Sequence, residues 1–456
     1  MALEKRSSRR KFGIASLFLL FALAFLPVGC DAQEIRIDGS GPAGEPVTIR
    51  YVAAGGPIWS VPEGAAIEQF HAQMPDIEID RQWQERSLSN YFTESPPPDA
   101  ILGAEGHELR HAAQQDLLSD LSEIWVDNNL AEAYGRQFGE VGRVDGTFRL
   151  VPVGYFWTGI FYNKEVFERY DLVPPATWEE FVTICETLLA NGETPLSVAG
   201  QSIYHNYLWF SYLNMRLNGP SFHRHLIQGQ ESYTDERIAL VWESWITLFR
   251  RGYFIERPNV TSESGSIKAL IPGVEDSPLT AKEAVMTLAP HFSLRHLSPE
   301  SASELDFFQF PQMDPTSSVG EIATVFGYII PAEAAHQPEA SAFVAFMASA
   351  EAQALQMARI VEDPTNVGWI PLHRDVDRAL LSVAARKAEE IVGGADEVLP
   401  PLLMALPRSM QAGFKTVFDG MFKQLNSRET EIDVSEIQSI LEEARQQALQ
   451  RGDYQQ

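Results

Sequence analysis

The chain has 456 residues, of which 21% are charged and 11% are aromatic, and its formal net charge is −27. This length suffices for two or three domains with their own cores, and the composition is that of a globular rather than a disordered protein. An acidic surface repels phosphate, so the charge argues against a nucleic-acid partner. The acidic residues form no long block, which predicts that the charge is spread over solvated faces.

Residues 1–29 have the pattern of an export signal. A basic stretch at residues 5–11 precedes an uncharged apolar run at residues 12–28, which is too short for a membrane span. The arginine pair in "SRRKF" leaves both the general secretory and the twin-arginine route open. "LPVGC" resembles a bacterial lipobox in which Cys30 carries the lipid, although Pro27 stands where that motif has Leu. We therefore expect an exported protein, periplasmic or at the cell surface, that is anchored to the membrane through Cys30.

The residues after this signal predict a tether and no disulfide. Residues 30–46 are rich in Gly, Pro and acidic residues, which is typical of a linker between an anchor and a folded body. The chain contains two cysteines, Cys30 and Cys185, so acylation of the first leaves the second without a partner. Cys185 lies on an apolar helical stripe and is expected to be a small buried hydrophobic residue.

The next elements indicate an α/β layer structure. We expect a strand at "VTIRYVA", a helix over residues 65–73, a second strand at "IEIDRQW" and a third after the proline turn of "PPPDAILGAEG". Another helix follows near residue 107. Strands that alternate with helices in this way favour a sheet covered by helices.

Helix and strand signals continue to the C-terminus. Thr177 and Glu180 form a capping box, and Gly192 suits the left-handed residue after that helix. Further helices are expected from about 204 to 217, from about 235 with Trp242 and Trp245 facing inward, from about 338 to 346, and from about 433. "AVMTLAP", "LDFFQFP" and "TVFGYIIPAE" are predicted to be buried strands.

One region resembles a known family. The stretch "VPVGYFWTGIFYNKEVFERYDLVPPATWEEF" with the later "LLANGETP" is similar to the extracellular sugar-binding proteins of bacterial ABC importers, solute-binding protein family 1, which includes maltose-binding protein. The shared positions are Pro152, Tyr162, Asn163, Lys164, Phe167, Pro174, Pro175, Thr177, Trp178, Glu180, Gly192 and Pro195. Two departures are Ala281, where a Gly-Lys-Ala-Ala-Met-like run usually begins, and "APHF", which replaces a small-Gly-x-Trp ending.

The resemblance implies a fold and a division into lobes. The fold is α/β, two-lobed and periplasmic-binding-protein-like (type II), with three crossovers between the lobes near residues 155–158, 320–324 and 368–371. Lobe I would comprise residues 47–155 plus 322–367, and lobe II residues 159–318 plus 372–450. The second lobe would begin with a strand at Gly159, and crossovers of this kind turn by small backbone changes while the lobes stay rigid.

The resemblance also implies a function. The chain would be the substrate-binding protein of an ABC transporter that captures a carbohydrate, an oligosaccharide, between its lobes. Closure would then present both lobes to permease subunits in the membrane. Such a protein is a monomer, needs no cofactor or metal, and catalyses no reaction.

A carbohydrate site needs a particular mixture of side chains. Aromatic rings cover the apolar faces of a pyranose, while carboxylates, amides and guanidinium groups satisfy its hydroxyls. Ordinary packing is the alternative for each candidate, and alternation favours Tyr155 and Trp157 because it places both on one side of the chain. The candidates, which the resemblance places at strand ends or crossovers, are Trp59, Glu105, Tyr155, Trp157, His205, Asn206, Phe326 and Trp369.

A rival hypothesis is a secreted zinc metallopeptidase. His107-Glu108-x-x-His111 is a literal H-E-x-x-H motif, which on a helix places two imidazoles for zinc and a glutamate as general base. Glu132 is the available third ligand. The same residues also fit a plain amphipathic helix, which we favour. A glycosidase would need a second placed carboxylate besides Glu105, and a receptor for a non-sugar solute is a further alternative.

Overall fold

The computed structural model describes residues 46–53, 63–273, 284–362, 368–427 and 432–454. The predicted export signal at 1–29, nearly all of the tether, and the residues Cys30, Trp59 and Ala281 lie outside these ranges. Within the ranges, no helix is both long and apolar enough to cross a membrane.

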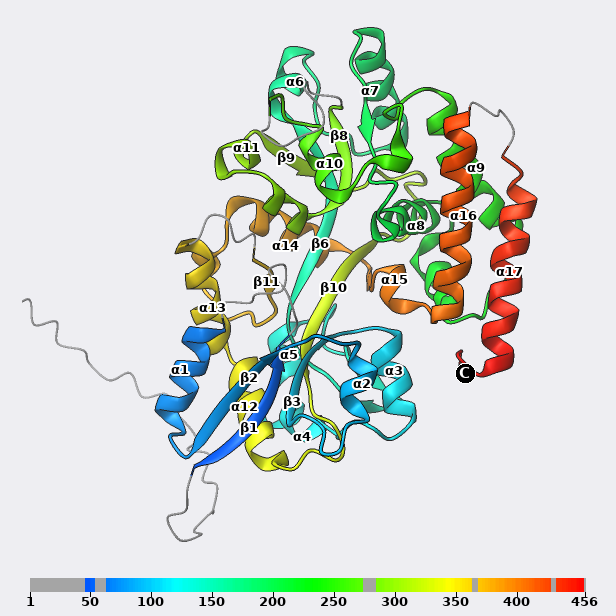
Figure 1. The fold of residues 1–456 in the computed structure, drawn as a ribbon. Coiled ribbons are helices and arrows are strands. Elements are labelled where there is room, and N and C mark those ends of the chain that lie inside the picture. The colour runs from blue at the N-terminus through cyan, green and yellow to red at the C-terminus, as the bar shows by residue number, and fades with distance from the viewer. Residues whose placement is uncertain (1–45, 54–62, 274–283, 363–367, 428–431, 455–456) are drawn as a thin grey trace, which may run out of the picture. The chain divides into compact units, whose positions relative to one another are not determined.

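Three parallel strands form the first part of the sheet. β1 (Val47–Ala53) pairs with β2 (Ile77–Trp83) along its whole length and with β3 (Ala100–Ala104) near its end. Side chains alternate between the two faces, so Tyr51 packs with the core that α1 and α12 cover, whereas Val52 packs with α2 and α3. Figure 1 shows these helices on either side of the strands. They are α1 (Gly64–Gln73), α2 (Leu88–Phe92), α3 (His107–Gln114) and α12 (Gln337–Ala348).

Two long strands connect this part of the sheet to a second one. β6 (Val151–Asn163) pairs with β10 (Gly320–Ile329) from Val151 to Trp157, and then with β8 and β9 from Thr158 onward. In Figure 1, β6 and β10 run side by side from the group around β1–β3, and β6 alone continues to the group around β8 and β9. Every residue of β6 is buried, which explains why its sequence alternates poorly. The strand that was expected to open the second lobe at Gly159 is the second half of β6, which runs through that residue without a break.

The ten strands paired in one sheet among the described residues have the path β2-β1-β3-β10-β6-β8-β7, with β9 and β11 also on β6 and β12 on β10. The change of partner on β6 falls at Trp157–Thr158, inside the first predicted crossover. The number of crossovers and the lobe boundaries stay predictions. The strands not yet bounded are β4 (Arg143–Val144), β5 (Thr147–Phe148), β7 (Leu196–Ser197), β8 (Met286–Pro290), β9 (Leu305–Phe308), β11 (Ile370–Pro371) and β12 (Glu397–Leu399).

Helices make up most of the second group. Its core contains Trp209, Trp242, Trp245 and Cys185, all fully buried, which confirms the expectation for the last three. The main helices of this group are α6 (Lys164–Arg169), α7 (Trp178–Ala190), α8 (Ile203–Ile227), α9 (Glu236–Arg250), α15 (Leu402–Ala405), α16 (Arg408–Ser427) and α17 (Val434–Arg451). The remaining helical segments are α4 (Ser122–Asp127), α5 (Leu130–Tyr134), η1 (Pro258–Val260), α10 (Glu263–Lys268), η2 (His291–His296), α11 (Pro299–Ser303), α13 (Ala350–Glu362), η3 (Arg378–Leu380) and α14 (Val383–Gly394).

The predicted helix boundaries are largely confirmed. Thr177 and Glu180 form both hydrogen bonds of a capping box, and Gly192 has a φ of 80°. Asp235 caps α9 by accepting a hydrogen bond from Arg237 N. The helix predicted to end near residue 218 does break at Gly219, whose φ is 81°. Because Pro220 is well suited to a first helical position, a new helix starts at once and reaches Ile227.

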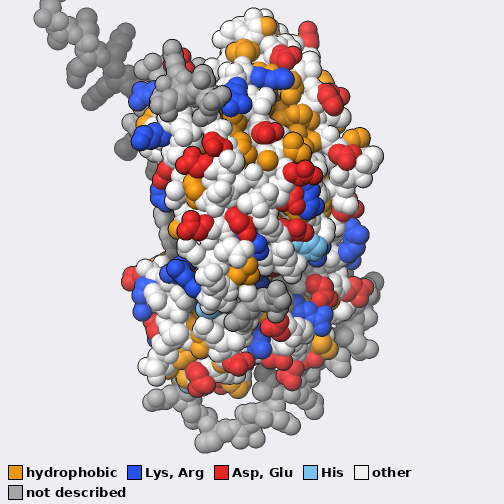
Figure 2. All heavy atoms as spheres, turned by 90° about the vertical axis from the view of Figure 1, so that its right-hand side faces the viewer, with side chains coloured by type: hydrophobic (Ala, Val, Ile, Leu, Met, Phe, Trp, Pro, Cys, Tyr) orange, Lys and Arg blue, Asp and Glu red, His pale blue; other side chains and the backbone are white. Residues whose placement is uncertain are grey.

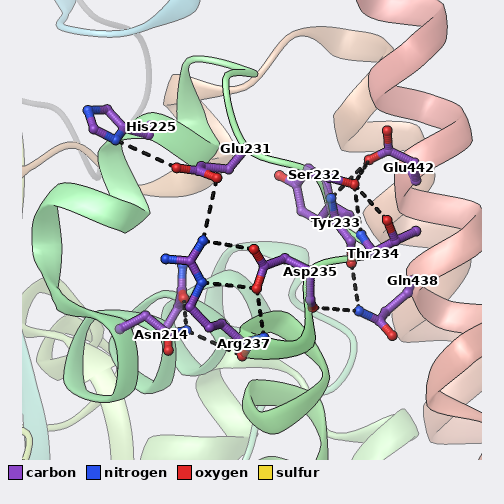
Figure 3. A network of polar contacts seen from close by, with 11 residues as sticks. Asn214, His225, Glu231, Ser232, Tyr233, Thr234, Asp235, Arg237, Gln438 and Glu442 are labelled. Atoms are coloured by element: carbon purple, nitrogen blue, oxygen red, sulfur yellow. Dashed lines mark hydrogen bonds and ion pairs between the residues drawn. The ribbon is translucent and has the colours of Figure 1, made fainter.

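A polar network fastens the C-terminal helix to the loop before α9. The Glu442 carboxylate accepts hydrogen bonds from Ser232 Oγ (3.0 Å) and Tyr233 N (2.9 Å), and it pairs with Arg445. Gln438 donates to the carbonyl oxygens of Tyr233 and Asp235, each at 2.9 Å. Figure 3 shows Gln438 and Glu442 pointing from α17 toward this loop. Burial raises the pKa of Glu442, but the hydrogen bonds that its carboxylate accepts from Arg445, Tyr233 and Ser232 outweigh this and lower the pKa from its ordinary value of 4.5 to about 2.

We expect Glu442→Gln to destabilise the protein by about 1–3 kcal/mol at pH 7, since hydrogen bonds to a charged acceptor are lost. A carboxylate whose folded-state pKa is depressed stabilises the protein above its unfolded-state pKa. The difference between variant and wild type should therefore shrink as pH falls from about 4.5 toward 2. Urea denaturation at several pH values measures this, and a difference that does not depend on pH would contradict it.

The surface charge is dispersed. Figure 2 shows the face that is on the right in Figure 1, where acidic side chains are interspersed with basic and uncharged ones. This distribution agrees with the expectation that the net charge of −27 is spread over solvated faces.

Candidate functional site

A cleft of about 580 Å³ lies between the ends of β2 and β3 on one side and α15 and α16 on the other. Parallel strands end at the same edge of a sheet, and that edge is where ligands bind in open α/β sheets. The two sides are separated by about 300 residues in the chain. The residues that line the cleft are Gln84, Glu85, Arg86, Ser87, Leu88, Leu102, Gly103, Ala104, Glu105, Gly106, His107, Glu108, Phe326, Leu403, Met404, Arg408 and Gln411.

The first turn of α3 contacts the opposite side directly. Arg110 donates a hydrogen bond to Ala405 O (3.0 Å), and Arg408 lies 3.1 Å from the Glu108 carboxylate. Gly106 precedes α3 and lies so close to α15 that a Cβ at this position would be 2.5 Å from Met404 O. A glycine is therefore required here by the close approach of the two backbones.

Glu105 is a partly buried acidic group that lines the cleft. Burial raises the pKa of its carboxyl, and the nearby Arg110 opposes that shift. Glu105 and His107 also line a second cavity of about 530 Å³ on the other side of α3. Burial lowers the pKa of His107 to about 4, so this imidazole is neutral at physiological pH. A partly buried carboxyl beside Arg110 is well placed to accept hydrogen bonds from a hydroxylated ligand.

An aromatic cluster continues from the cleft along the sheet. Phe326 lines the cleft and contacts Trp369 edge-to-face, with ring centroids 5.0 Å apart. Phe156 packs on the same Phe326 ring at 5.1 Å. Gly154 makes this arrangement possible, because a Cβ there would be 2.3 Å from Cδ1 of Trp369 and 2.9 Å from Cζ of Phe326. The Nε1 of Trp369 is buried and has no hydrogen-bond partner among the described residues.

Tyr155 and Trp157 are buried in different surroundings. Tyr155 stacks on Phe138 with ring centroids 4.8 Å apart. Trp157 stacks on His291 at 5.1 Å, and His291 Nε2 is hydrogen-bonded to Gly368 O at 2.8 Å. Trp157 is therefore linked to the segment that carries Trp369. Both residues are less than 5% exposed, and neither lines the cleft.

His205 and Asn206 lie in the first turn of α8 rather than at a strand end or a crossover. His205 Nδ1 contacts Ser202 Oγ (2.8 Å), and Asn206 Nδ2 donates to Gly200 O (3.1 Å). His205 Nε2 and Asn206 Oδ1 are buried and find no partner in the described part of the chain. Burial lowers the pKa of His205 to about 4. The structure thus brings Glu105, Phe326 and Trp369 close together and sets His205 and Asn206 on a separate element, while Trp59 lies outside the described residues.

The H-E-x-x-H motif has structural partners. His107 and His111 stack at 5.7 Å on α3, His111 contacts Gln115, and Glu108 pairs with Arg408. Glu132 on α5 accepts a hydrogen bond from Asn129, which immediately precedes that helix. No group of three or more potential metal ligands occurs within the described ranges. The zinc-peptidase hypothesis therefore has no support, and the buried Leu109, Ala112 and Ala113 confirm the amphipathic helix.

Several residues of the cleft were not predicted from the sequence. The segment 84–88 follows a predicted strand at the carboxyl edge of the sheet, so its position was a usable signal. The sequence gives no signal of this kind for the opposite side of the cleft, which is formed by Met404, Arg408 and Gln411. Only the packing of α15 against α3 brings these residues to the cleft.

Comparison with known proteins decides the family. A model of the bacterial extracellular solute-binding protein family matches residues 62–354. The chain belongs to this family. The solute-binding protein is also similar to the multiple sugar-binding protein of Streptococcus mutans, with 24% identity over 232 residues. The aligned region covers 49% of this chain and 52% of that protein. It spans about half the length of the curated relatives that it matches first.

Solved structures confirm the fold of the solute-binding protein. The solute receptor AcbH, described as having an exclusive preference for β-D-galactopyranose, has a TM-score of 0.73 at 20% identity and covers 89% of this chain and 98% of its own. RafE in complex with raffinose has a TM-score of 0.64 at 17% identity, and the match covers 88% of this chain and 100% of the RafE chain. The α/β fold of two-lobed periplasmic solute-binding proteins is thereby confirmed.

Proposed function

We propose that this solute-binding protein captures a carbohydrate in the cleft between α3 and α15. The observation that carries the proposal is the composition of that cleft. Carboxylates, amides and guanidinium groups converge on a space that is also bounded by Phe326, Leu88 and Met404. Its volume of about 580 Å³ is in the range of small-molecule sites.

The chemistry of the cleft fits a sugar. Phe326 is 3% exposed, and the part of its ring that borders the cleft would meet an apolar sugar face. Gln84, Glu105 and Gln411 offer acceptors and donors for hydroxyl groups, and a closed cleft makes an unmatched hydroxyl costly on either side. The charges of both signs in the lining disfavour a strongly anionic solute.

The relatives support the same class of ligand and the wider assignment. One curated relative is named a multiple sugar-binding protein, and two similar structures are described with a galactopyranose preference and with bound raffinose. We propose that the protein is exported, is lipid-anchored through Cys30, works as a monomer with membrane permease subunits, and catalyses no reaction.

A thermal-shift and calorimetric screen of the purified protein against mono- and oligosaccharides tests the proposal. We expect at least one carbohydrate to raise the melting temperature, because a ligand of the native state stabilises it by mass action. Phe326→Ala should lower the affinity for that ligand by about tenfold, because one aromatic contact contributes about that much to binding. Val383→Ala, a change at a residue 75% exposed on α14, serves as the control with unchanged affinity.

Two results would contradict the proposal. The first is that no carbohydrate binds while an amino acid, peptide or polyol phosphate does. The second is a bound carbohydrate whose affinity is the same in wild type and Phe326→Ala, which would place the ligand away from this cleft.

A further inference from the structure

His291 is a buried imidazole that the proposed function does not use. It is 4% exposed and lies directly after β8, at the start of η2. It belongs to the segment "APHF", one of the two places where the chain departs from the family pattern. A buried polar side chain is costly unless its polar atoms find partners. The partners of this ring therefore indicate its role.

Both ring nitrogens of His291 are hydrogen-bonded to backbone groups. Trp157 N donates to Nδ1 at 3.3 Å, and Nε2 lies 2.8 Å from Gly368 O. A backbone N–H can only donate and a carbonyl oxygen can only accept, so Nδ1 is the acceptor and Nε2 carries the proton. One tautomer of the neutral imidazole therefore makes both bonds at once.

The two partners lie beyond the point at which β6 changes its pairing. Thr158 is the first residue of β6 that pairs with β8, and Trp157 is the last that pairs with β10. Gly368 comes shortly before β11, which pairs with the earlier part of β6. His291 thus extends from β8, in the second group of strands, to two segments that pair with the half of β6 nearer to β1–β3. A change in the angle between the two groups alters the length of at least one of its bonds.

His291 is also connected to the wall of the cleft by two routes. Its ring packs on Phe156, with centroids 5.4 Å apart, and Phe156 packs on Phe326 at 5.1 Å. The second route follows the backbone, because Gly368 is followed by Trp369, which contacts Phe326 edge-to-face at 5.0 Å. Both routes end at the phenyl ring that lines the cleft. Movement at His291 therefore reaches the surface that would meet a solute.

We propose that His291 is a positioning residue: its two hydrogen bonds hold the two groups of strands at one angle and keep Phe326 in place. The part of this inference that concerns binding rests on the proposed function. Without these bonds, the two groups sample a wider range of angles. A smaller fraction of the molecules then has the cleft in its binding arrangement, which lowers the apparent affinity in proportion.

The test measures the distance between two spin labels by pulsed electron paramagnetic resonance in the full-length protein without carbohydrate. The labels are attached to Val126→Cys on α4 and to Val173→Cys between α6 and α7, positions that are 75% and 74% exposed. A Cys30→Ser background prevents labelling of that residue, and Cys185 is buried. We expect one narrow distance distribution in this background.

His291→Phe should broaden the distance distribution, because it keeps an aromatic ring against Trp157 and removes both hydrogen bonds. His291→Asn retains an acceptor near the place of Nδ1, and His291→Gln retains a donor near that of Nε2, so each should give an intermediate width. A carbohydrate that binds the wild type should bind His291→Phe about tenfold more weakly, since two hydrogen bonds that favour the binding arrangement are lost.

His223→Phe is the matched control. His223 is fully buried on α8, and its Nδ1 contacts Asn214 Nδ2 of the same helix at 2.8 Å. The same substitution there removes a buried imidazole that does not join the two groups of strands. It should lower the melting temperature and leave the distance distribution unchanged.

The outcomes separate this inference from the proposed function. A distribution in His291→Phe equal to that of the background would overturn the inference, and so would equal broadening in His223→Phe, which would show a general effect of losing a buried imidazole. If His291→Phe does not fold, the Asn and Gln variants decide by the same criterion. The distance measurement needs no carbohydrate, so a protein that binds none would overturn the proposed function and leave the result for His291 valid.

Discussion

Arg216→Leu is expected to lower the free energy of unfolding by about 3–5 kcal/mol, the cost of leaving a buried charge without its partner. Arg216 on α8 and Glu321 on β10 are 0% and 1% exposed, and their side chains are 2.5 Å apart. Arg216 also donates to the carbonyl oxygens of Phe310 (3.1 Å) and Gly320 (2.5 Å). Removal of the guanidinium leaves two carbonyl groups and a carboxylate without that donor in a dry environment.

The effect should depend on the charge that remains. Glu321 accepts further hydrogen bonds from Tyr212 and Gln309, so it is held in place after the substitution. The double variant Arg216→Leu with Glu321→Leu should be less destabilised than the single variant, because no unpaired charge remains. Urea denaturation measures both. A single variant within about 1 kcal/mol of wild type, the scale of an exposed pair, would contradict the account.

Gly154→Ala is expected to weaken carbohydrate binding by more than tenfold. The added Cβ would be 2.3 Å from Cδ1 of Trp369 and 2.9 Å from Cζ of Phe326, distances that real Cβ atoms do not show. Both rings must move, and overpacking of this kind also costs about 1–3 kcal/mol of stability. Because Phe326 lines the cleft, its displacement changes the surface that meets the ligand.

Gly420→Ala is the matched control for this change. A Cβ at Gly420 meets no atom within 4 Å, and the residue lies on α16, so affinity should be unchanged. Calorimetric titration gives the affinity, and a shift in tryptophan fluorescence reports the movement of Trp369. Unchanged affinity in a folded Gly154→Ala protein would show that the cluster of Phe326 and Trp369 takes no part in binding.

The local signals in the sequence were sufficient for most elements. The capping box at Thr177 and Glu180 and the break at Gly219 depend only on residues a few positions apart. Both could therefore be predicted from the local sequence. The continuity of β6 could not be predicted, because its two halves lie against different partners and only the three-dimensional pairing shows that the strand does not stop at Thr158.

The candidate site was predictable in part. Glu105 follows a recognisable strand, and Phe326 lies in one, so the resemblance placed both near a ligand edge. The α15–α16 side of the cleft depends on contacts across about 300 residues, such as that of Arg110 with Ala405, for which a single sequence gives no signal. His205 and Asn206 lie in the helix that was predicted to begin near residue 204, and α8 buries both rather than presenting them at a strand end or crossover.

The most direct test is a crystal structure of the protein with its best carbohydrate from the binding screen. The account predicts sugar density between α3 and α15, with one ring against Phe326 and a hydroxyl group bonded to Glu105. Density at another surface of the protein, with the cleft between α3 and α15 filled only by water, would contradict it.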